Sequence, residues 1–126
     1  SGIKPKAPGM KYRHYAPKAS LTIIEGAQDK VIRRINELLE EGEKKGERIG
    51  VIASAESAAC YQGGVVRTIG SRSDELSISR HLFGILRDFD TLAVDRIYSE
   101  SFETPQMGQA IMNRLMKAAG HQVLEV

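Results

Sequence analysis

The chain has 126 residues, of which 41% are hydrophobic and 27% are charged, and this composition favours one globular domain. Its formal net charge of +2 hides an asymmetry, because residues 1–18 hold five of the 18 Lys and Arg residues and no acid. A single cysteine excludes an internal disulfide, no Cys/His spacing predicts a metal site, and the lack of a signal or long apolar run favours a cytoplasmic protein.

Residues 1–19 are predicted to form an extended linker, since they include three prolines and show no sustained apolar periodicity. We expect the folded domain to span residues 20–126. A cationic segment thus precedes an acidic domain. Such a segment favours an anionic partner, although solvated basic linkers without a specific partner are common.

Strands and helices are predicted to alternate along the domain. Short apolar runs indicate strands at 21–25, 48–53, 65–70 and 96–100, and the tail at 121–126 is a candidate for a fifth. Apolar residues spaced three and four apart predict helices at 28–45, 73–89 and 104–119, with Ser73 and Thr104 as caps and one or two helical turns between 54 and 64. The pattern is typical of an α/β fold, and we expect a Rossmann-like open three-layer sandwich with a mostly parallel sheet of four to five strands.

Ligands of open α/β sheets usually bind beyond the carboxyl ends of the strands, which here means the segments 54–57, 70–73 and 101–108. No glycine-rich phosphate motif follows a strand, and ordinary helix capping is the favoured role of these segments. Ser54 belongs to the first segment. Asn113 and Arg114 lie in a predicted helix, where asparagine is mildly unfavourable, so these three polar residues are candidates for a site or for specific structural hydrogen bonds.

Four other residues invite a chemical role. Cys60 is expected to be a buried, inert thiol, and His81 a partly buried structural histidine. Glu100 and Glu103 flank the end of a strand and could form an acid pair, although a solvated rim is the more ordinary arrangement for such carboxylates.

The linker contains an unusual run of basic and aromatic residues. If the run is extended, as the prolines on either side favour, Lys11, Arg13 and Tyr15 point to one side and Tyr12 and His14 to the other. Cations interleaved with aromatic rings suit contact with phosphate and stacking on a base. A soluble tether is the open alternative.

Five segments carry a resemblance to a known family: PGMKYRHYAPKA, RIGVIAS, LFGILRDFD, AVDRIYSES and GQAIMNRLMKAAG. In this order they resemble the C-terminal half of two-domain threonylcarbamoyl-AMP synthases of the Sua-five type, linker included. The resemblance implies a parent enzyme, a nucleotidyltransferase whose YrdC-like catalytic domain makes threonylcarbamoyl-AMP and pyrophosphate from L-threonine, bicarbonate and ATP with magnesium. The product serves threonylcarbamoyladenosine modification of tRNA.

The same resemblance places the linker across the catalytic cleft of the upstream domain. Contacts to bound nucleotide or product would then come from Lys11, Tyr12, Arg13, His14 and Tyr15. We expect the chain to be a fragment without catalytic residues of its own, whose first partner is the N-terminal YrdC-like domain. The alternative is a regulatory or interaction module that binds tRNA, a tRNA-modifying partner or a small effector.

Overall fold

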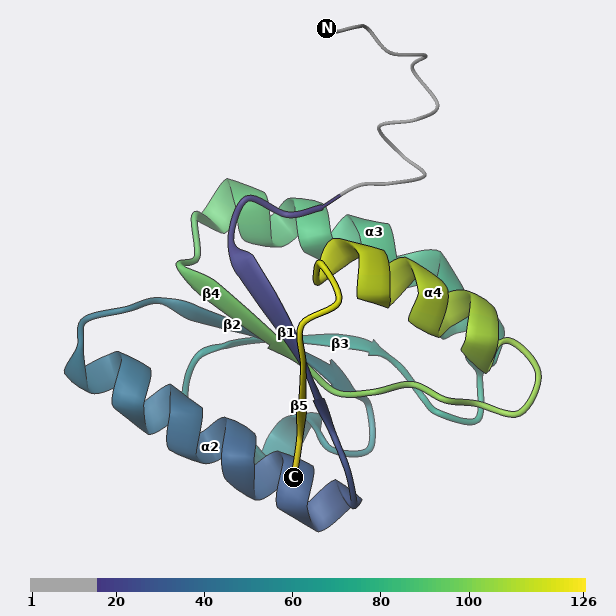
Figure 1. Cartoon of the computed structure of the whole chain (residues 1–126), viewed down its shortest axis with the longest axis horizontal. Helices are drawn as coiled ribbons and strands as arrows, with labels where there is room; N and C mark the ends of the chain where they lie inside the picture. Colours follow the sequence, from purple (N-terminus) through teal and green to yellow (C-terminus); the bar gives the residue numbers. More distant parts are fainter. Residues whose placement is uncertain (1–15) are drawn as a thin grey trace, which may run out of the picture.

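The structure is a computed structural model that describes residues 16–126; the linker residues predicted to contact nucleotide, 11–15, lie outside this range. The described chain alternates between strands and helices (Figure 1), in the order β1 (Ser20–Glu25), α2 (Gln28–Lys44), β2 (Ile49–Ser54), a 3-10 turn η1 (Ala58–Cys60), β3 (Val65–Gly70), α3 (Glu75–Leu92), β4 (Arg96–Ser99), α4 (Gly108–Ala118) and β5 (Val123–Glu125). The predicted tail strand is confirmed as β5.

All strand pairs of the sheet are parallel, and the strand order is β3-β2-β4-β1-β5. Helix α2 covers one face of the sheet, and α3 and α4 cover the other (Figure 1). The predicted α/β fold in three layers is therefore confirmed, with five strands. Within residues 16–126, no helix combines the length and the apolar character needed to cross a membrane.

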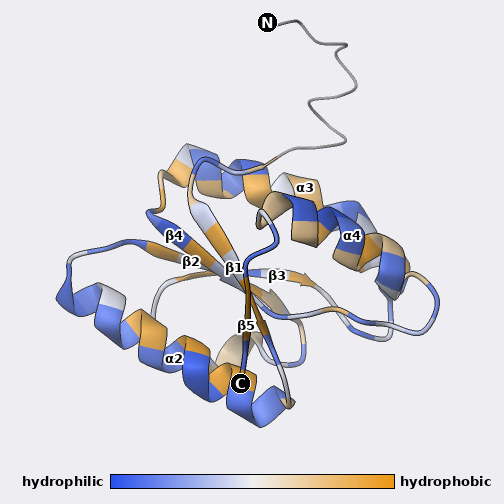
Figure 2. Cartoon of the chain, viewed as in Figure 1, coloured by the Kyte–Doolittle hydropathy of each residue, from blue (hydrophilic) through white to orange (hydrophobic). Residues whose placement is uncertain are grey.

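Each face of the sheet has its own hydrophobic core. On the α2 face the core includes Val31, Ile35 and Leu39, which recur along one side of the helix because they are spaced four residues apart. On the other face α3 contributes Ile78, Leu82, Ile85, Leu86 and Phe89, and α4 contributes Ile111 and Leu115. Strand β2 is apolar along most of its length (Figure 2) and is buried at every residue, as expected for a strand that is covered on both faces.

The register brings the carboxyl ends of the central strands to the same level. Ile23 of β1 and Ile52 of β2 both lie opposite Ser99 of β4. The residues that follow these strands therefore meet at one edge of the sheet, as parallel strands require. On the outer side, the pairing of β2 with β3 shifts register between Ala53 and Ser54.

Two predicted helix starts are wrong. Asp74, not Ser73, caps α3, and its side chain accepts a hydrogen bond from the Ser77 N–H at 3.2 Å. Helix α4 starts at Gly108 rather than at Thr104, because the preceding residues form a turn in which the Gly108 N–H donates to the Thr104 carbonyl at 3.2 Å. A carboxylate from α3, described below, holds this turn.

Candidate functional site

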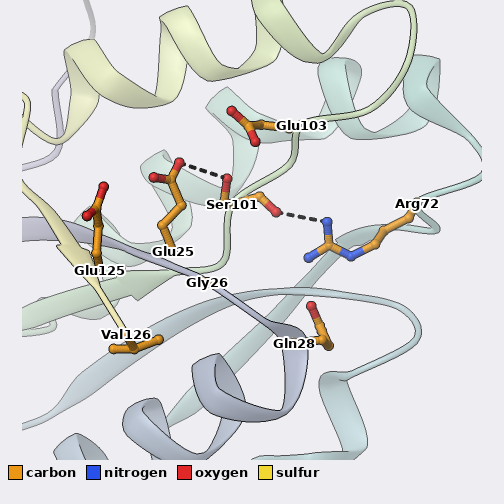
Figure 3. A pocket seen from close by; sticks show the side chains of 8 residues that line it. All are labelled: Glu25, Gly26, Gln28, Arg72, Ser101, Glu103, Glu125 and Val126. Atoms are coloured by element: carbon orange, nitrogen blue, oxygen red, sulfur yellow. Dashed lines mark hydrogen bonds between the residues drawn. The ribbon is translucent and has the colours of Figure 1, made fainter.

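A surface cleft of about 520 Å³ opens at the carboxyl ends of the strands. Glu25 and Gly26 reach it from the end of β1, Arg72 from the loop after β3, and Ser101 from the segment after β4 (Figure 3). The Ser101 hydroxyl donates to Glu25 Oε2 at 3.3 Å, which links the ends of β1 and β4. Residues from three strand ends therefore form one site, in the position where open α/β sheets usually bind ligands.

A fully buried carboxylate, Glu100, lies directly behind this cleft. It accepts hydrogen bonds from the Tyr61 hydroxyl at 2.5 Å, from the Ser54 N–H at 3.3 Å and from the Ser57 hydroxyl. The Arg72 guanidinium completes the set, with Nη2 2.8 Å from Glu100 Oε1. The cost of burying this charge is offset because both carboxylate oxygens are hydrogen-bonded and a cation is adjacent.

Arg72 forms the boundary between the buried network and the cleft. Its Nη1 donates to the Ser101 carbonyl at 2.8 Å, and its guanidinium carbon lies 4.9 Å from the centre of the Phe102 ring. Its side chain is 31% exposed, so one edge of it reaches the cleft. The guanidinium is thus fixed by an ion pair, a carbonyl and an aromatic ring before any ligand arrives.

Burial and the neighbouring carboxylate also set the protonation state of the Tyr61 hydroxyl. Its removal from water raises the pKa of the Tyr61 hydroxyl far above its ordinary value, and the hydrogen bond to Glu100 raises it further. The hydroxyl therefore remains a proton donor to Glu100 throughout the physiological pH range. This arrangement stabilises the network and leaves Tyr61 no role as a proton acceptor.

The charges around the cleft favour a positively charged group. Glu25, Glu103 and Glu125 contribute three carboxylates to its walls, whereas the positive charge of Arg72 is already paired with Glu100. Coulomb attraction in this setting favours a ligand with an ammonium or guanidinium group over a phosphate. Within residues 16–126, no group of three His, Cys, Asp or Glu side chains has the geometry to hold a metal ion.

Carboxylates also accept hydrogen bonds from backbone N–H groups of two nearby loops. Glu56 accepts from the Ser71 hydroxyl at 2.5 Å and from the Arg72 N–H at 3.1 Å. Glu75 accepts from the Thr104 hydroxyl at 2.5 Å and from the N–H groups of Gln106 and Met107 at 3.0 and 2.5 Å. These hydrogen bonds, with the hydroxyl donor as the largest cause in each case, lower the pKa of both carboxyls. The loops are therefore internally capped, as the sequence favoured.

The structure places the predicted polar residues in different surroundings. Ser54 is fully buried, and its hydroxyl lies 2.8 Å from that of Ser57, so it belongs to the Glu100 network. Asn113 is exposed on α4 and lines a smaller cleft of about 250 Å³ next to Glu103. Arg114 donates to the Ser79 hydroxyl at 3.1 Å and so links α4 to α3. The three residues do not form one site.

Several expectations about individual side chains are wrong. Cys60 is exposed rather than buried, because it ends a surface 3-10 turn. His81 is also exposed, although its Nδ1 lies 3.1 Å from the Ile69 carbonyl oxygen. Glu100 and Glu103 form no acid pair and no common rim, since the first is buried and the second is exposed.

Of the two residues that contribute most to this site, sequence reasoning missed Arg72 and gave Glu100 the wrong surroundings. Arg72 stood in a predicted loop, and nothing in its neighbours indicated a pairing with a residue 28 positions away. The available signal for Glu100 was its position at the end of the predicted strand 96–100, in a sheet expected to be covered on both faces.

Comparisons with known proteins agree with this fold. The family model described as "Threonylcarbamoyl-AMP synthase, C-terminal domain" matches residues 1–120. Curated proteins named threonylcarbamoyl-AMP synthase from Bacillus subtilis (strain 168) and Pyrococcus abyssi are 45% and 44% identical over 121 residues, which is 96% of this chain and 34% of each relative. The chain therefore spans about a third of the length of the curated relatives it matches.

Solved structures give the same result. The crystal structure of P. abyssi Sua5 complexed with L-threonine superposes with a TM-score of 0.79 at 42% identity, covering 100% of this chain and 35% of that one. The C-terminal Sua5 domain from Pyrococcus horikoshii gives a TM-score of 0.68 at 30% identity, covering 88% of this chain and 100% of that one. Because the family model, the relatives and the fold agree over nearly all of its length, the chain belongs to the family of threonylcarbamoyl-AMP synthase C-terminal domains.

Proposed function

We propose that the chain is the linker and accessory domain of a cytoplasmic threonylcarbamoyl-AMP synthase that serves tRNA modification. The observation that carries the proposal is the match of this chain to about a third of proteins with that name. The remaining two-thirds would contain the catalytic domain, which would use L-threonine, bicarbonate and ATP with magnesium. This chain would then act on catalysis through its linker and would turn over no substrate by itself.

The proposed mechanism for the linker is closure over the active site. Lys11 and Arg13 would contact phosphate oxygens, and Tyr12, His14 and Tyr15 would contact the base, ribose or adenylate product. A closed linker would shield the carbamate intermediate from water. The backbone N–H of Lys18 donates to Asp90 Oδ1 at 2.9 Å, so the point at which the linker meets the folded domain is held on α3.

The test uses the full-length enzyme and measures pyrophosphate release with ATP, magnesium, L-threonine and bicarbonate. Arg13→Ala combined with Tyr15→Ala should reduce turnover by at least about tenfold, because both contacts act on bound nucleotide. Lys4→Ala combined with Lys6→Ala is the matched control and should leave turnover within about twofold. Undiminished activity of the Arg13 and Tyr15 variant would contradict closure by the linker.

The cleft at the strand ends favours a second candidate, a regulatory module that binds a small effector. β1 begins at Ser20, next to the linker, and ends at Glu25, in the cleft. With about 3.3 Å per residue, the two ends of this strand are roughly 17 Å apart. An effector in the cleft would thus lie at the opposite end of β1 from the point where the linker joins it, and its binding to the isolated chain should survive deletion of residues 1–18. Titration with tRNA and with tRNA-modifying partners distinguishes the two kinds of module. Binding of either would favour an interaction module over one that binds a small effector.

A further inference from the structure

A second surface of the domain carries a concentration of unpaired positive charge. A groove of about 430 Å³ runs between the outer edge of β3 and the side of α3. Its walls include Arg67 from β3 and Arg80 and Arg87 from α3, together with His81 and Phe83. Among the described residues, Asp88 is the one acidic residue that lines it.

The three arginines differ from most other arginines of the described chain. Arg33, Arg34, Arg72 and Arg96 each lie within 4.0 Å of a carboxylate. Among residues 16–126, no such ion pair involves Arg67, Arg80 or Arg87, and the only hydrogen bond from their side chains is a long one of 3.4 Å from Arg67 to the Val66 carbonyl. Their charge is therefore available to a partner, in a domain that otherwise has more acids than bases.

The spacing of these charges suits a linear anion. Arg80 and Arg87 are seven residues apart on α3, which is two helical turns, or roughly 10 Å along the axis. Arg67 faces them from β3, across the groove. Successive phosphates follow one another along a single strand, so the three arginines could each contact a phosphate of the same strand. Guanidinium groups bind phosphate oxygens in a bidentate manner.

The groove also has an apolar component. Phe83 is half-buried between the arginines in sequence and contributes an aromatic ring to the wall. Cations beside an aromatic wall are typical of surfaces that hold single-stranded nucleic acid, since the phosphates meet the cations and the bases meet the ring. An acidic peptide would satisfy the arginines but would leave this ring without a planar partner.

We propose that the groove between β3 and α3 binds the backbone of a single strand of nucleic acid, with Arg67, Arg80 and Arg87 on its phosphates. This surface lies on α3 and the β3 edge, whereas the linker proposed to act in catalysis lies before β1. The binding is independent of the catalytic proposal, so either one can fail while the other holds.

The test is fluorescence anisotropy of the full 126-residue chain with labelled single-stranded RNA and DNA of about 15 nucleotides, near the upper end of known site sizes. The triple variant Arg67→Gln, Arg80→Gln, Arg87→Gln should bind at least about tenfold more weakly, and its slope of log K against log salt should become shallower by about 2, since each phosphate contact on a single strand contributes about 0.7. Comparison of the RNA and DNA affinities shows which of the two nucleic acids the groove prefers.

The matched control removes the same number of charges from α2 and the residue after it, through Lys30→Gln, Lys44→Gln and Lys45→Gln, and should bind within about twofold of the wild type. Both variants keep the basic linker, so a difference between them reports the groove alone. Equal losses in the two variants, unchanged binding by the groove variant, no binding by the wild type at low salt, or tighter binding of poly-glutamate than of either oligonucleotide would each overturn the proposal. Circular dichroism of both variants should match the wild type, because five of the six substituted residues are exposed and Arg67 is only half-buried.

Discussion

Arg72 and Glu100 join the loop after β3 to the end of β4 through an ion pair with a distance of 2.8 Å, in which the carboxylate is completely buried. The strands that carry them are separated by β2 in the sheet, so the pair spans the carboxyl edge above the intervening strand. The Ser54 N–H at the end of β2 donates to the same carboxylate. One buried charge thus fixes the ends of three strands, and two of the segments that it joins contribute Arg72 and Ser101 to the cleft.

Glu100→Gln should therefore destabilise the domain strongly. The variant leaves the Arg72 guanidinium without its counter-ion. It also replaces one acceptor oxygen by an NH2 donor, which would face donors that bond to the carboxylate in the wild type. We expect a loss of about 3 kcal/mol, the lower end of the range for breaking a buried pair, because Arg72 is partly exposed. Urea unfolding measures the change. Glu103→Gln, on the exposed side of the same segment, should stay within about 0.5 kcal/mol, and an equal loss in both variants would contradict the assignment.

Tyr61→Phe tests how much an uncharged hydrogen-bond donor to Glu100 contributes to stability. The ring should still pack in the core of the α2 face, while Glu100 loses the donor that lies at 2.5 Å. We expect a cost of about 1.5 kcal/mol, the lower value for a hydrogen bond to a charged group. Tyr98→Phe is the control, since Tyr98 packs in the same cluster and its hydroxyl makes no hydrogen bond within the described residues. The Tyr98 variant should lose less than about 0.5 kcal/mol, and the reverse order would contradict the prediction.

The change in the free energy of unfolding with pH in the alkaline range should also differ in Tyr61→Phe. In the unfolded chain the hydroxyl ionises near pH 10, whereas in the folded domain its raised pKa keeps it protonated well above that pH. The unfolded state therefore releases the proton first, and this group's contribution to stability is present below pH 10 and decreases above it. The wild type should lose about 1.4 kcal/mol per pH unit more than the variant above pH 10. Urea unfolding at pH 9 to 11 measures this, and parallel curves would contradict it.

The titration of Glu75 should report its hydrogen bonds to the turn before α4. Its lowered pKa means that its contribution to stability is present above the ordinary glutamate value of 4.5 and is lost as the pH falls through the folded value. The amide signals of Gln106 and Met107 should titrate with this group in an NMR experiment, because their N–H groups donate to it. In Glu75→Gln the titration should disappear and both amides should exchange faster. Glu103→Gln should leave the two amides unchanged.

Two glycines should respond in opposite directions to alanine. A Cβ at Gly50 in β2 would lie 2.8 Å from the Phe89 ring, so Gly50→Ala should cost about 1 to 3 kcal/mol through overpacking. A Cβ at Gly84 in α3 would meet no atom within 4 Å, so Gly84→Ala should stabilise the domain by up to about 1 kcal/mol through helix propensity. Thermal unfolding of both variants measures the difference. A stabilising Gly50→Ala would show that Phe89 does not pack on β2 as described.

Most of the secondary structure could be predicted from the sequence because it depends on local patterns. Strand β3 and the first residue of α2 match the predictions, and the other strands agree to within about two residues at either end. The start of α4 could not be predicted in this way. Thr104 followed by Pro105 has the pattern of a helix start, but Glu75 binds the N–H groups of the next residues and stabilises a turn instead. A contact from another helix therefore outweighed a favourable local sequence.

The sequence by itself determined the order of strands and helices, the two apolar faces of the sheet and the resemblance to one family, because periodicity and motifs are properties of neighbouring residues. The tertiary structure alone decided the strand order β3-β2-β4-β1-β5 and, through it, which residues share the carboxyl edge. Glu100 shows the difference most clearly. Its residue type favours a solvated position, and its burial becomes energetically acceptable through the hydrogen bonds from Ser54, from Ser57 and Tyr61 on either side of η1, and from Arg72 in the loop after β3.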